Sequence, residues 1–305
     1  MSTKSAWRNL TLILAVAAAL VLALGALPAW AQGVIGYSID SDATGYLWRI
    51  NLNTGVATRI GYTGYGDVES LSFSPAGVLY GVDQFSGRLV TCSLSTGACA
   101  GVGSLMVGYF EDTGLSFDSS GGLWMSTDEP PPFNFYSLNP ISGAATLIGP
   151  QGQEVTGLAF RNGVLYGLGG DYRDNLVVMN RTTGAATPVG PLGLPPLDPE
   201  GFLIDGGIDF DGEGVLWGIG DPDDRPDTLP SRVFTINPAT GAATLVATVT
   251  NSNGTPLLGF ESLAIWPAEQ PPEEPVVPEP GTLVLLGSGL AGLAGYARMR
   301  SRKGD

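Results

Sequence analysis

Short runs of alternating apolar and polar residues recur along the middle of the chain, and each run ends in the same kind of turn. The runs read LWRIN, LVTCS, FYSLN, VVMN and VFTIN. The turns that follow read NLNTGVAT, SLSTGACA, NPISGAAT, NRTTGAAT and NPATGAAT, with glycines at positions 55, 97, 143, 184 and 241. A period of two predicts β-strands, and Asn or Ser before the bend with Gly after it suits a type I turn closed by a residue at positive φ. Each turn is therefore predicted to lie in a β-hairpin.

A second set of apolar segments precedes these hairpins. It reads ESLSF from Glu69, TGLSF from Thr113, TGLAF from Thr156, GGIDF from Gly206 and ESLAI from Glu261. A glycine-containing turn and a short strand with an aromatic residue follow, as in GVLYGVD and GVLWGIG, and IGYSID at Ile35 is the first copy of that strand. Each repeat unit is therefore predicted to contain four short antiparallel strands.

The spacing and the order of the repeats predict a closed ring. The turn glycines are 42, 46, 41 and 57 residues apart, and a polar, Pro-rich insertion from Asp221 to Ser231 explains the longest interval. The first unit lacks the ESLSF-type strand, whereas the last such strand, Glu261 to Ile265, has no unit after it. We predict an all-β fold, a five-bladed β-propeller of four-stranded antiparallel blades whose first blade is closed by the C-terminal strand. The alternative, an open β-solenoid, would not need this shared unit.

The N-terminal segment, residues 1–32, is predicted to be a secretory signal peptide. Lys4 and Arg8 precede an apolar run from Leu10 to Leu24, and the small-residue pattern Ala29-Trp30-Ala31 offers a cleavage site for signal peptidase. The run is short for a spanning helix, although a retained N-terminal anchor is the alternative. The propeller domain is then predicted to cover residues 33–267.

After the repeat region, the composition of the chain changes twice. Residues 268–277 belong to a Pro- and Glu-rich tract that is predicted to be an extended linker. Residues 278–305 contain Pro278-Glu279-Pro280, an apolar stretch expected to form a short transmembrane helix, and a basic terminus. This order of parts resembles the PEP-CTERM sorting signal.

That resemblance has implications for where the protein is found. It implies cleavage by an exosortase in a Gram-negative bacterium that makes extracellular polysaccharide. It also implies an inner-membrane intermediate, followed by a location at the cell surface or outside the cell. The alternative is an ordinary single-span anchor.

The repeat region, roughly residues 34–266, resembles extracellular propellers that are grouped with NHL-like, SMP-30-like and quinoprotein-like domains. Segments such as GLSFDSSGGLW are the basis of this resemblance. It implies an architecture and no particular activity, because binders, hydrolases and lactonases share such propellers.

Charge and composition exclude several kinds of chemistry. Between Gly33 and Pro278 there are 8 Arg, no Lys and 27 Asp plus Glu, so this part has a net charge of −19. Such a surface repels nucleic acid. The chain has no histidine, which excludes Ser-His-Asp and Cys-His nucleophile systems and His-ligated zinc or copper sites. Any catalysis would have to depend on carboxylates, Arg, Tyr or Ser.

The two cysteines, Cys92 and Cys99, occupy symmetric positions on either side of the turn in CSLSTGAC. Cross-strand neighbours have Cβ atoms about 4.5 to 5.5 Å apart, and an oxidising compartment favours a disulfide over free thiols. We therefore predict a structural disulfide between them.

The segment Asp209-Phe-Asp211-Gly-Glu213 places three carboxylates at alternate positions, and hard oxygen ligands with that spacing are a candidate Ca²⁺ site. The segment lacks the full EF-hand loop, and sister units have FDSSGG and FSPAGV in the same hairpin. A polar turn is therefore the alternative.

Aromatic residues recur at two equivalent strand positions. The first set is Tyr80, Trp124, Tyr166 and Trp217, and the second is Trp48, Tyr136 and Phe234. A sugar-stacking platform is one interpretation. Recurrence in nearly every blade favours the other, which is packing between blades.

A carboxylate recurs at the start of the first strand in most units: Glu69, Asp112, Asp205 and Glu261, with Glu154 nearby. The innermost strands of a propeller line its central channel, so these side chains are expected to gather at one mouth. Convergent acids raise one another's pKa or hold a cation such as Ca²⁺. The alternative is an acidic, solvated rim.

We interpret the chain as an exported, non-catalytic surface or matrix protein that binds extracellular polysaccharide or protein. The competing hypothesis is a carboxylate-dependent glycoside hydrolase or lyase that acts at the channel mouth. A redox or quinone enzyme is disfavoured because nothing in the sequence specifies a cofactor.

Overall fold

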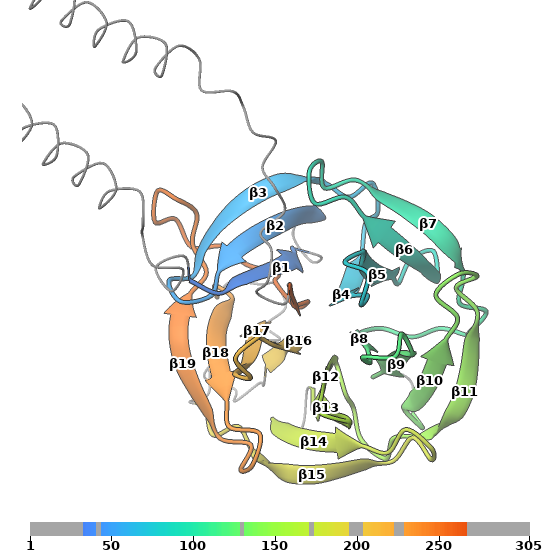
Figure 1. The fold of residues 1–305 in the computed structure, drawn as a ribbon. Helices are drawn as coiled ribbons and strands as arrows, with labels where there is room; N and C mark the ends of the chain where they lie inside the picture. The colour runs from blue at the N-terminus through green and yellow to red at the C-terminus, as the bar shows by residue number, and fades with distance from the viewer. Residues whose placement is uncertain are drawn as a thin grey trace, which may run out of the picture. The chain divides into compact units, whose positions relative to one another are not determined.

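The described part of the chain consists of β-strands and the turns between them, as the computed structural model shows (Figure 1). The structure describes residues 33–40, 44–128, 131–170, 174–194, 204–222 and 229–266. The predicted signal peptide, linker and sorting segment lie outside these residues. The chain divides into two units, Met1–Trp266 and Pro267–Asp305, and all the described strands belong to the first.

The strands form five sheets of four antiparallel strands each, which we call blades 1 to 5. Blade 1 contains β20 (Ala264–Ile265), β1 (Ile35–Ile39), β2 (Tyr46–Asn51) and β3 (Val56–Tyr62). Blade 2 contains β4 (Val68–Phe73), β5 (Leu79–Asp83), β6 (Arg88–Cys92) and β7 (Cys99–Ser104). Blade 3 contains β8 (Thr113–Phe117), β9 (Leu123–Thr127), β10 (Asn134–Leu138) and β11 (Ala145–Pro150).

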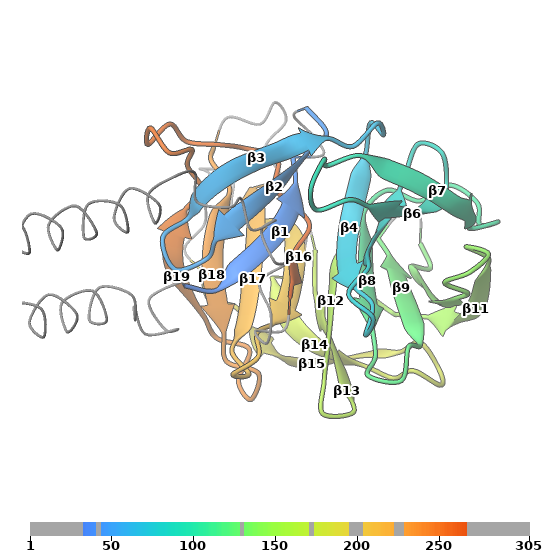
Figure 2. The same ribbon diagram turned by 45° about the horizontal axis from the view of Figure 1, so that its top comes forward.

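The last two blades follow the same order. Blade 4 contains β12 (Gly157–Arg161), β13 (Val164–Leu168), β14 (Asn175–Met179) and β15 (Ala186–Pro191). Blade 5 contains β16 (Ile204–Phe210), β17 (Leu216–Pro222), β18 (Arg232–Ile236) and β19 (Ala243–Thr248). The blades surround a common centre, and β4, β8, β12 and β16 lie side by side around it (Figures 1 and 2). The predicted five-bladed propeller is therefore confirmed.

Blade 1 is built from both ends of the propeller region. Strand β20 pairs with β1 in antiparallel register, with Gly36 opposite Ile265 and Tyr37 opposite Ala264. The side chain of Asp209 in β16 also accepts a hydrogen bond from the Ile265 N–H, at 2.8 Å. The closing strand is thus held by β1 of its own blade and by β16 of blade 5, and it completes the first repeat as the sequence predicted.

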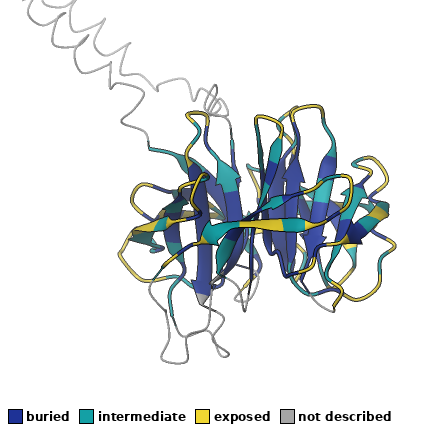
Figure 3. Ribbon diagram, turned by 90° about the horizontal axis from the view of Figure 1, so that it is seen from below, coloured by how far each residue is buried: buried dark blue, intermediate teal, exposed yellow. Residues whose placement is uncertain are grey.

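The hydrophobic core is divided into five clusters, and each cluster lies between two neighbouring blades. The recurrent aromatic residues belong to these clusters. Tyr80 packs edge-on against Phe117 with ring centroids 5.1 Å apart, and Trp124 stacks on Phe135 at 5.9 Å. The packing interpretation of these aromatics is confirmed. Burial is greatest in the inner strands, and exposed residues lie in the loops and outer strands (Figure 3).

The recurrent turns also join each blade to the one before it. Their glycines have positive φ values from 72° to 83°. Two residues after each glycine, a backbone N–H donates to a carbonyl just after the outer strand of the preceding blade. The pairs are Ala57–Thr250, Cys99–Thr63, Ala145–Leu105, Ala186–Gln151 and Ala243–Leu192, at 2.7 to 3.0 Å. In the blade 2 hairpin, Cys92 and Cys99 lie opposite one another and form a disulfide.

Candidate metal centre

One face of the propeller, which we call the mouth face, is where the innermost strands β4, β8, β12 and β16 begin. Because successive strands are antiparallel, the connections that lead into even-numbered strands all lie on this face. These connections and the strand ends beside them hold most of the acids of the described residues: Asp40, Asp67, Glu69, Asp83, Glu111, Asp112, Asp128, Glu154, Asp174, Asp205, Asp221 and Glu261. The mouth face is therefore strongly acidic.

Three of these acids converge beside the central channel. Carboxylate oxygens of Glu69, Asp112 and Glu261 lie within 4.8 Å of one another. Glu69 is the second residue of β4, Asp112 directly precedes β8, and Glu261 leads into β20. The three belong to blades 2, 3 and 1, so closure of the ring brings them together. Among the described residues, no other three candidate ligand side chains meet in this way.

The side chains around the carboxyl group of Glu69 include the carboxyl groups of Asp67, Asp112 and Glu261. The Glu69 side chain is only 4% exposed, and its Oε2 atom accepts no hydrogen bond from the described residues. Burial raises the pKa of Glu69 well above its ordinary value, and the carboxyl groups of Asp67 and Asp112 raise it further, against a smaller opposing effect of a hydrogen bond with Glu261. Two carboxyl groups can share a hydrogen bond only if one is protonated. The cluster therefore favours binding of a proton or a cation.

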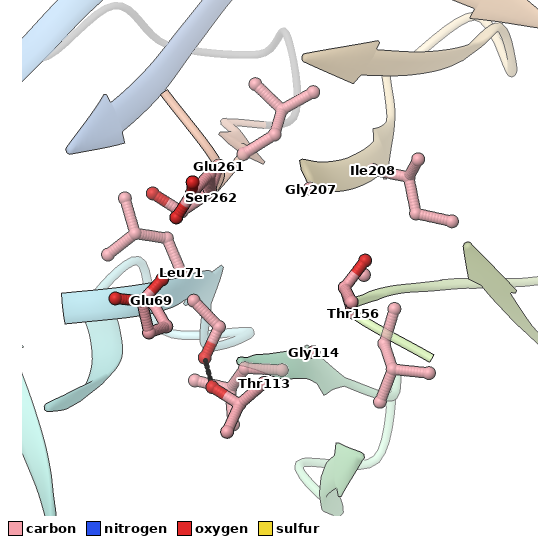
Figure 4. A pocket seen from close by; sticks show the side chains of 14 residues that line it. Glu69, Leu71, Thr113, Gly114, Thr156, Gly207, Ile208, Glu261 and Ser262 are labelled. Carbon is pink, nitrogen blue, oxygen red and sulfur yellow. Dashed lines mark hydrogen bonds between the residues drawn. The ribbon is translucent and has the colours of Figure 1, made fainter. Parts of the chain in front are cut away.

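The channel beneath these acids is nearly closed. Figure 4 shows Glu69 and Glu261 next to one another at one edge of the opening, with Thr156 across from them. Leu71, Leu115, Leu158, Ile208 and Leu263 narrow the channel to a free volume of about 10 Å³. This is about the least space in which one water molecule fits, so a sugar ring cannot enter.

Asp205, the fourth acid predicted at this mouth, does not belong to the three-carboxylate cluster. It is buried near the start of β16, opposite Asp221 of β17. The residue equivalent to Glu69 and Glu261 in this repeat is Gly206. Because side chains alternate along a strand, Asp205 and that position are on opposite faces of the sheet. Asp112 lies before the first residue of β8, so the alternation of side chains along that strand does not determine where its carboxylate lies.

The structure does not bring the carboxylates of Asp209, Asp211 and Glu213, the candidate Ca²⁺ site of the sequence, together as a group of three ligands. Asp209 accepts hydrogen bonds from the N–H groups of Ile265 and Phe210, both at 2.8 Å. Asp211 closes the β16–β17 turn, and its oxygens accept hydrogen bonds from the backbone N–H groups of Glu213, Gly214 and Val215 and from the indole of Trp217. Glu213 is exposed. The polar-turn alternative describes this segment.

One acid of this site, Asp67, was not predicted from the sequence. Asp67 is buried and lies close enough to Glu69 to raise its pKa. Its signal in the sequence is its place two residues before Glu69 in DVES, which keeps the two carboxyl groups close along the chain.

The strand pairing defines the class of protein, a five-bladed β-propeller closed by its own C-terminal strand. Among solved structures, the chain is similar to a protein of unknown function from Bacteroides thetaiotaomicron VPI-5482, at 20% identity and a TM-score of 0.45, with 60% of this chain and 52% of that chain covered. The chain thus spans about half the length of that relative. No curated protein matches the sequence at a significant level.

Two further solved structures are less similar to this chain in sequence. A chain of a nidogen–laminin complex shares 13% identity at a TM-score of 0.46, over 76% of this chain and 84% of that chain. A structural-genomics target provisionally assigned as a gluconolactonase shares 13% identity at a TM-score of 0.44, over 70% and 77%. At these TM-scores the likenesses support no functional argument.

A protein-family model matches the C-terminal segment of the chain. Residues 276–302 match the PEP-CTERM protein-sorting motif, as the sequence predicted. The motif marks proteins that are exported and sorted through the membrane to the cell surface or the extracellular space, and it implies processing by an exosortase. This protein is therefore an exported five-bladed propeller with a PEP-CTERM signal. Within the described ranges, no helix is long and apolar enough to cross a membrane.

Proposed function

We propose that this propeller is a non-catalytic surface or matrix protein that binds extracellular polysaccharide, and that a divalent cation such as Ca²⁺ at Glu69, Asp112 and Glu261 forms part of its binding surface. The observations on which the proposal depends are the convergence of three carboxylates and the buried Oε2 atom of Glu69, which has no hydrogen-bond partner among the described residues. Calcium takes six to eight oxygen ligands, so three carboxylates leave positions open. Saccharide hydroxyl groups are suitable ligands for those positions.

The same geometry speaks against the hydrolase alternative. A glycosidase needs its two carboxyl groups on either side of a glycosidic bond. Here Glu69 and Glu261 are nine-tenths buried, and the channel below them is too narrow for a sugar ring. The site has room for an ion and no room for a pyranose between the two carboxylates.

Calcium titration of the full-length protein tests the cation site. We expect Ca²⁺ to raise the melting temperature, because a ligand at 100 times its Kd stabilises the folded state by about 2.7 kcal/mol. Changing Glu69→Gln together with Glu261→Gln is expected to stabilise the metal-free protein, since it removes buried charge repulsion, and to abolish the Ca²⁺ response. The exposed Glu213→Gln is the matched control and keeps the response. Calorimetry that detects no Ca²⁺ binding tighter than millimolar would contradict the cation site.

A glycan array tests the polysaccharide part of the proposal. The full-length protein is applied with Ca²⁺ and then with a chelator, and the double variant is applied in parallel. We expect saccharide binding that weakens with the chelator and in the variant. Calcium binding without any saccharide binding would support the metal centre but contradict the proposed polysaccharide-binding function.

A further inference from the structure

The mouth face has a second hollow, which lies in blade 3 and is separate from the channel. It encloses about 150 Å³, compared with about 10 Å³ in the channel. We call it the blade 3 pocket; its walls include Tyr109, Phe110, Pro131, Pro132, Asn134 and Tyr136. One water molecule needs about 10 to 15 Å³ of such space, so this pocket is far larger than a single-water site. That suits one small organic ring better than a drug-sized ligand.

Aromatic side chains form much of the wall. Tyr109 is 70% exposed, so its ring is open to a ligand, whereas Phe110 is buried beneath the surface. The Tyr109 hydroxyl donates a hydrogen bond to a carboxylate oxygen of Glu111, which holds the exposed ring in one orientation. That hydrogen bond also raises the pKa of Tyr109 to about 12, so the phenol is neutral at physiological pH. The pocket therefore presents an uncharged aromatic surface that is already oriented.

The polar part of the pocket is built on a buried amide. Gln151 is 2% exposed, and its Nε2 donates to the backbone carbonyls of Thr127 and Asn134, at 2.7 and 3.0 Å. Thr127 Oγ1 also accepts a hydrogen bond from the Asn134 N–H, at 3.2 Å. Thr127 and Asn134 both line the pocket, as does Tyr136, whose phenol is hydrogen-bonded with Asn134. Aromatic faces and fixed amide and hydroxyl groups thus meet in one small space.

Charge limits what this pocket can hold. Glu111, Asp112 and Asp128 are near enough to Tyr109 to act on its ionisation, and residues 33–278 have a net charge of −19. An anionic saccharide such as a uronate would be repelled. A neutral sugar ring has apolar C–H faces for the aromatic wall and hydroxyl groups for Asn134 and Tyr136.

We propose that the blade 3 pocket binds one uncharged pyranose ring of a polysaccharide, stacked against Tyr109. This inference rests on the proposed function in one respect only, that the ligand is a polysaccharide. The ring site itself is distinct from the three carboxylates and does not need their cation.

Saturation-transfer NMR on the full-length protein, in a detergent without a sugar headgroup, tests the pocket. The probes are neutral hexasaccharides of glucose, mannose and galactose and one oligogalacturonate as the acidic comparison. We expect transfer to the C–H groups of a neutral ring with and without a chelator, and none to the oligogalacturonate. Tyr109→Ala is expected to weaken binding about tenfold, as loss of an aromatic anchor does. Tyr136→Phe keeps the ring and removes only the hydroxyl, so a smaller loss is expected.

Tyr62→Ala is the matched control, because Tyr62 is 53% exposed at the end of β3 in another blade. It should leave binding unchanged, and melting temperatures confirm that each variant folds. Absence of binding to every neutral probe overturns the inference, and so does full binding by the Tyr109→Ala protein. Binding that disappears with the chelator and in the Glu69→Gln, Glu261→Gln protein places the saccharide at the carboxylates instead. That result would support the proposed function and refute the pocket.

Discussion

Buried acids of the same type have opposite surroundings in this propeller. Asp211 is surrounded by N–H donors from its own turn and from Trp217, and Asp118 has the same arrangement, with Trp124 as its indole partner. Glu69 is surrounded by other carboxyl groups. The first kind of acid organises a hairpin, and the second creates a place for a proton or a cation. The sequence pattern made both Asp211 and Glu69 candidate cation ligands.

Asp209 gives a prediction at the same scale. Burial raises its pKa from 3.8 to about 7, although the Ile265 and Phe210 N–H groups oppose this. Between these values the folded state keeps a proton that the unfolded state releases, so stability falls as pH rises, by up to about 1.4 kcal/mol per pH unit. Asp209→Asn should flatten this slope, as measured by urea unfolding from pH 4 to 7.5. Glu213→Gln serves as the control, and an unchanged slope in the Asp209→Asn protein would show that another group is responsible.

At the scale of elements, the recurrent turn has two roles. Its glycine closes a hairpin, and the turn also packs on the outer strand of the neighbouring blade. A Cβ atom on Gly103 of β7 would come within 1.9 Å of the Ser142 carbonyl oxygen in the blade 3 turn. Equivalent close contacts occur at Gly61, Gly149 and Gly190. The repeated glycines of the outer strands are therefore required by contact between blades.

Substituting one of these glycines tests that role. Gly103→Ala should destabilise the protein by about 1 to 3 kcal/mol, because the added methyl group forces blades 2 and 3 apart. Gly108→Ala is the control, since a Cβ there meets nothing within 4 Å. Thermal unfolding of both proteins measures the difference. Equal melting temperatures of the two variants would mean that the outer strands accommodate the added methyl group without loss of stability.

At the scale of the whole molecule, the two-residue strand β20 determines whether the ring is closed. It pairs with β1 and contributes Ala264 and Ile265 to the cores on both sides of blade 1. A chain that ends at Trp266 should therefore keep the melting temperature of the full-length protein, whereas a chain that ends at Gly254 should unfold at a clearly lower temperature or fail to fold. Differential scanning calorimetry makes the comparison. A Gly254 truncation with an unchanged transition would contradict closure by β20.

The sequence by itself determined the strand order, the number of blades, the shared first blade and the sorting tail. It could do so because turn chemistry, alternation and targeting signals are local properties that repeat along the chain. The Cys92–Cys99 pairing followed in the same way from hairpin symmetry. Only the tertiary structure decided which acids meet, because Glu69, Asp112 and Glu261 converge through closure of the ring while Asp205 faces another way within β16. The blade 3 pocket likewise depends on how the β7–β8 connection packs beside β10, and no periodicity in the sequence reports that contact.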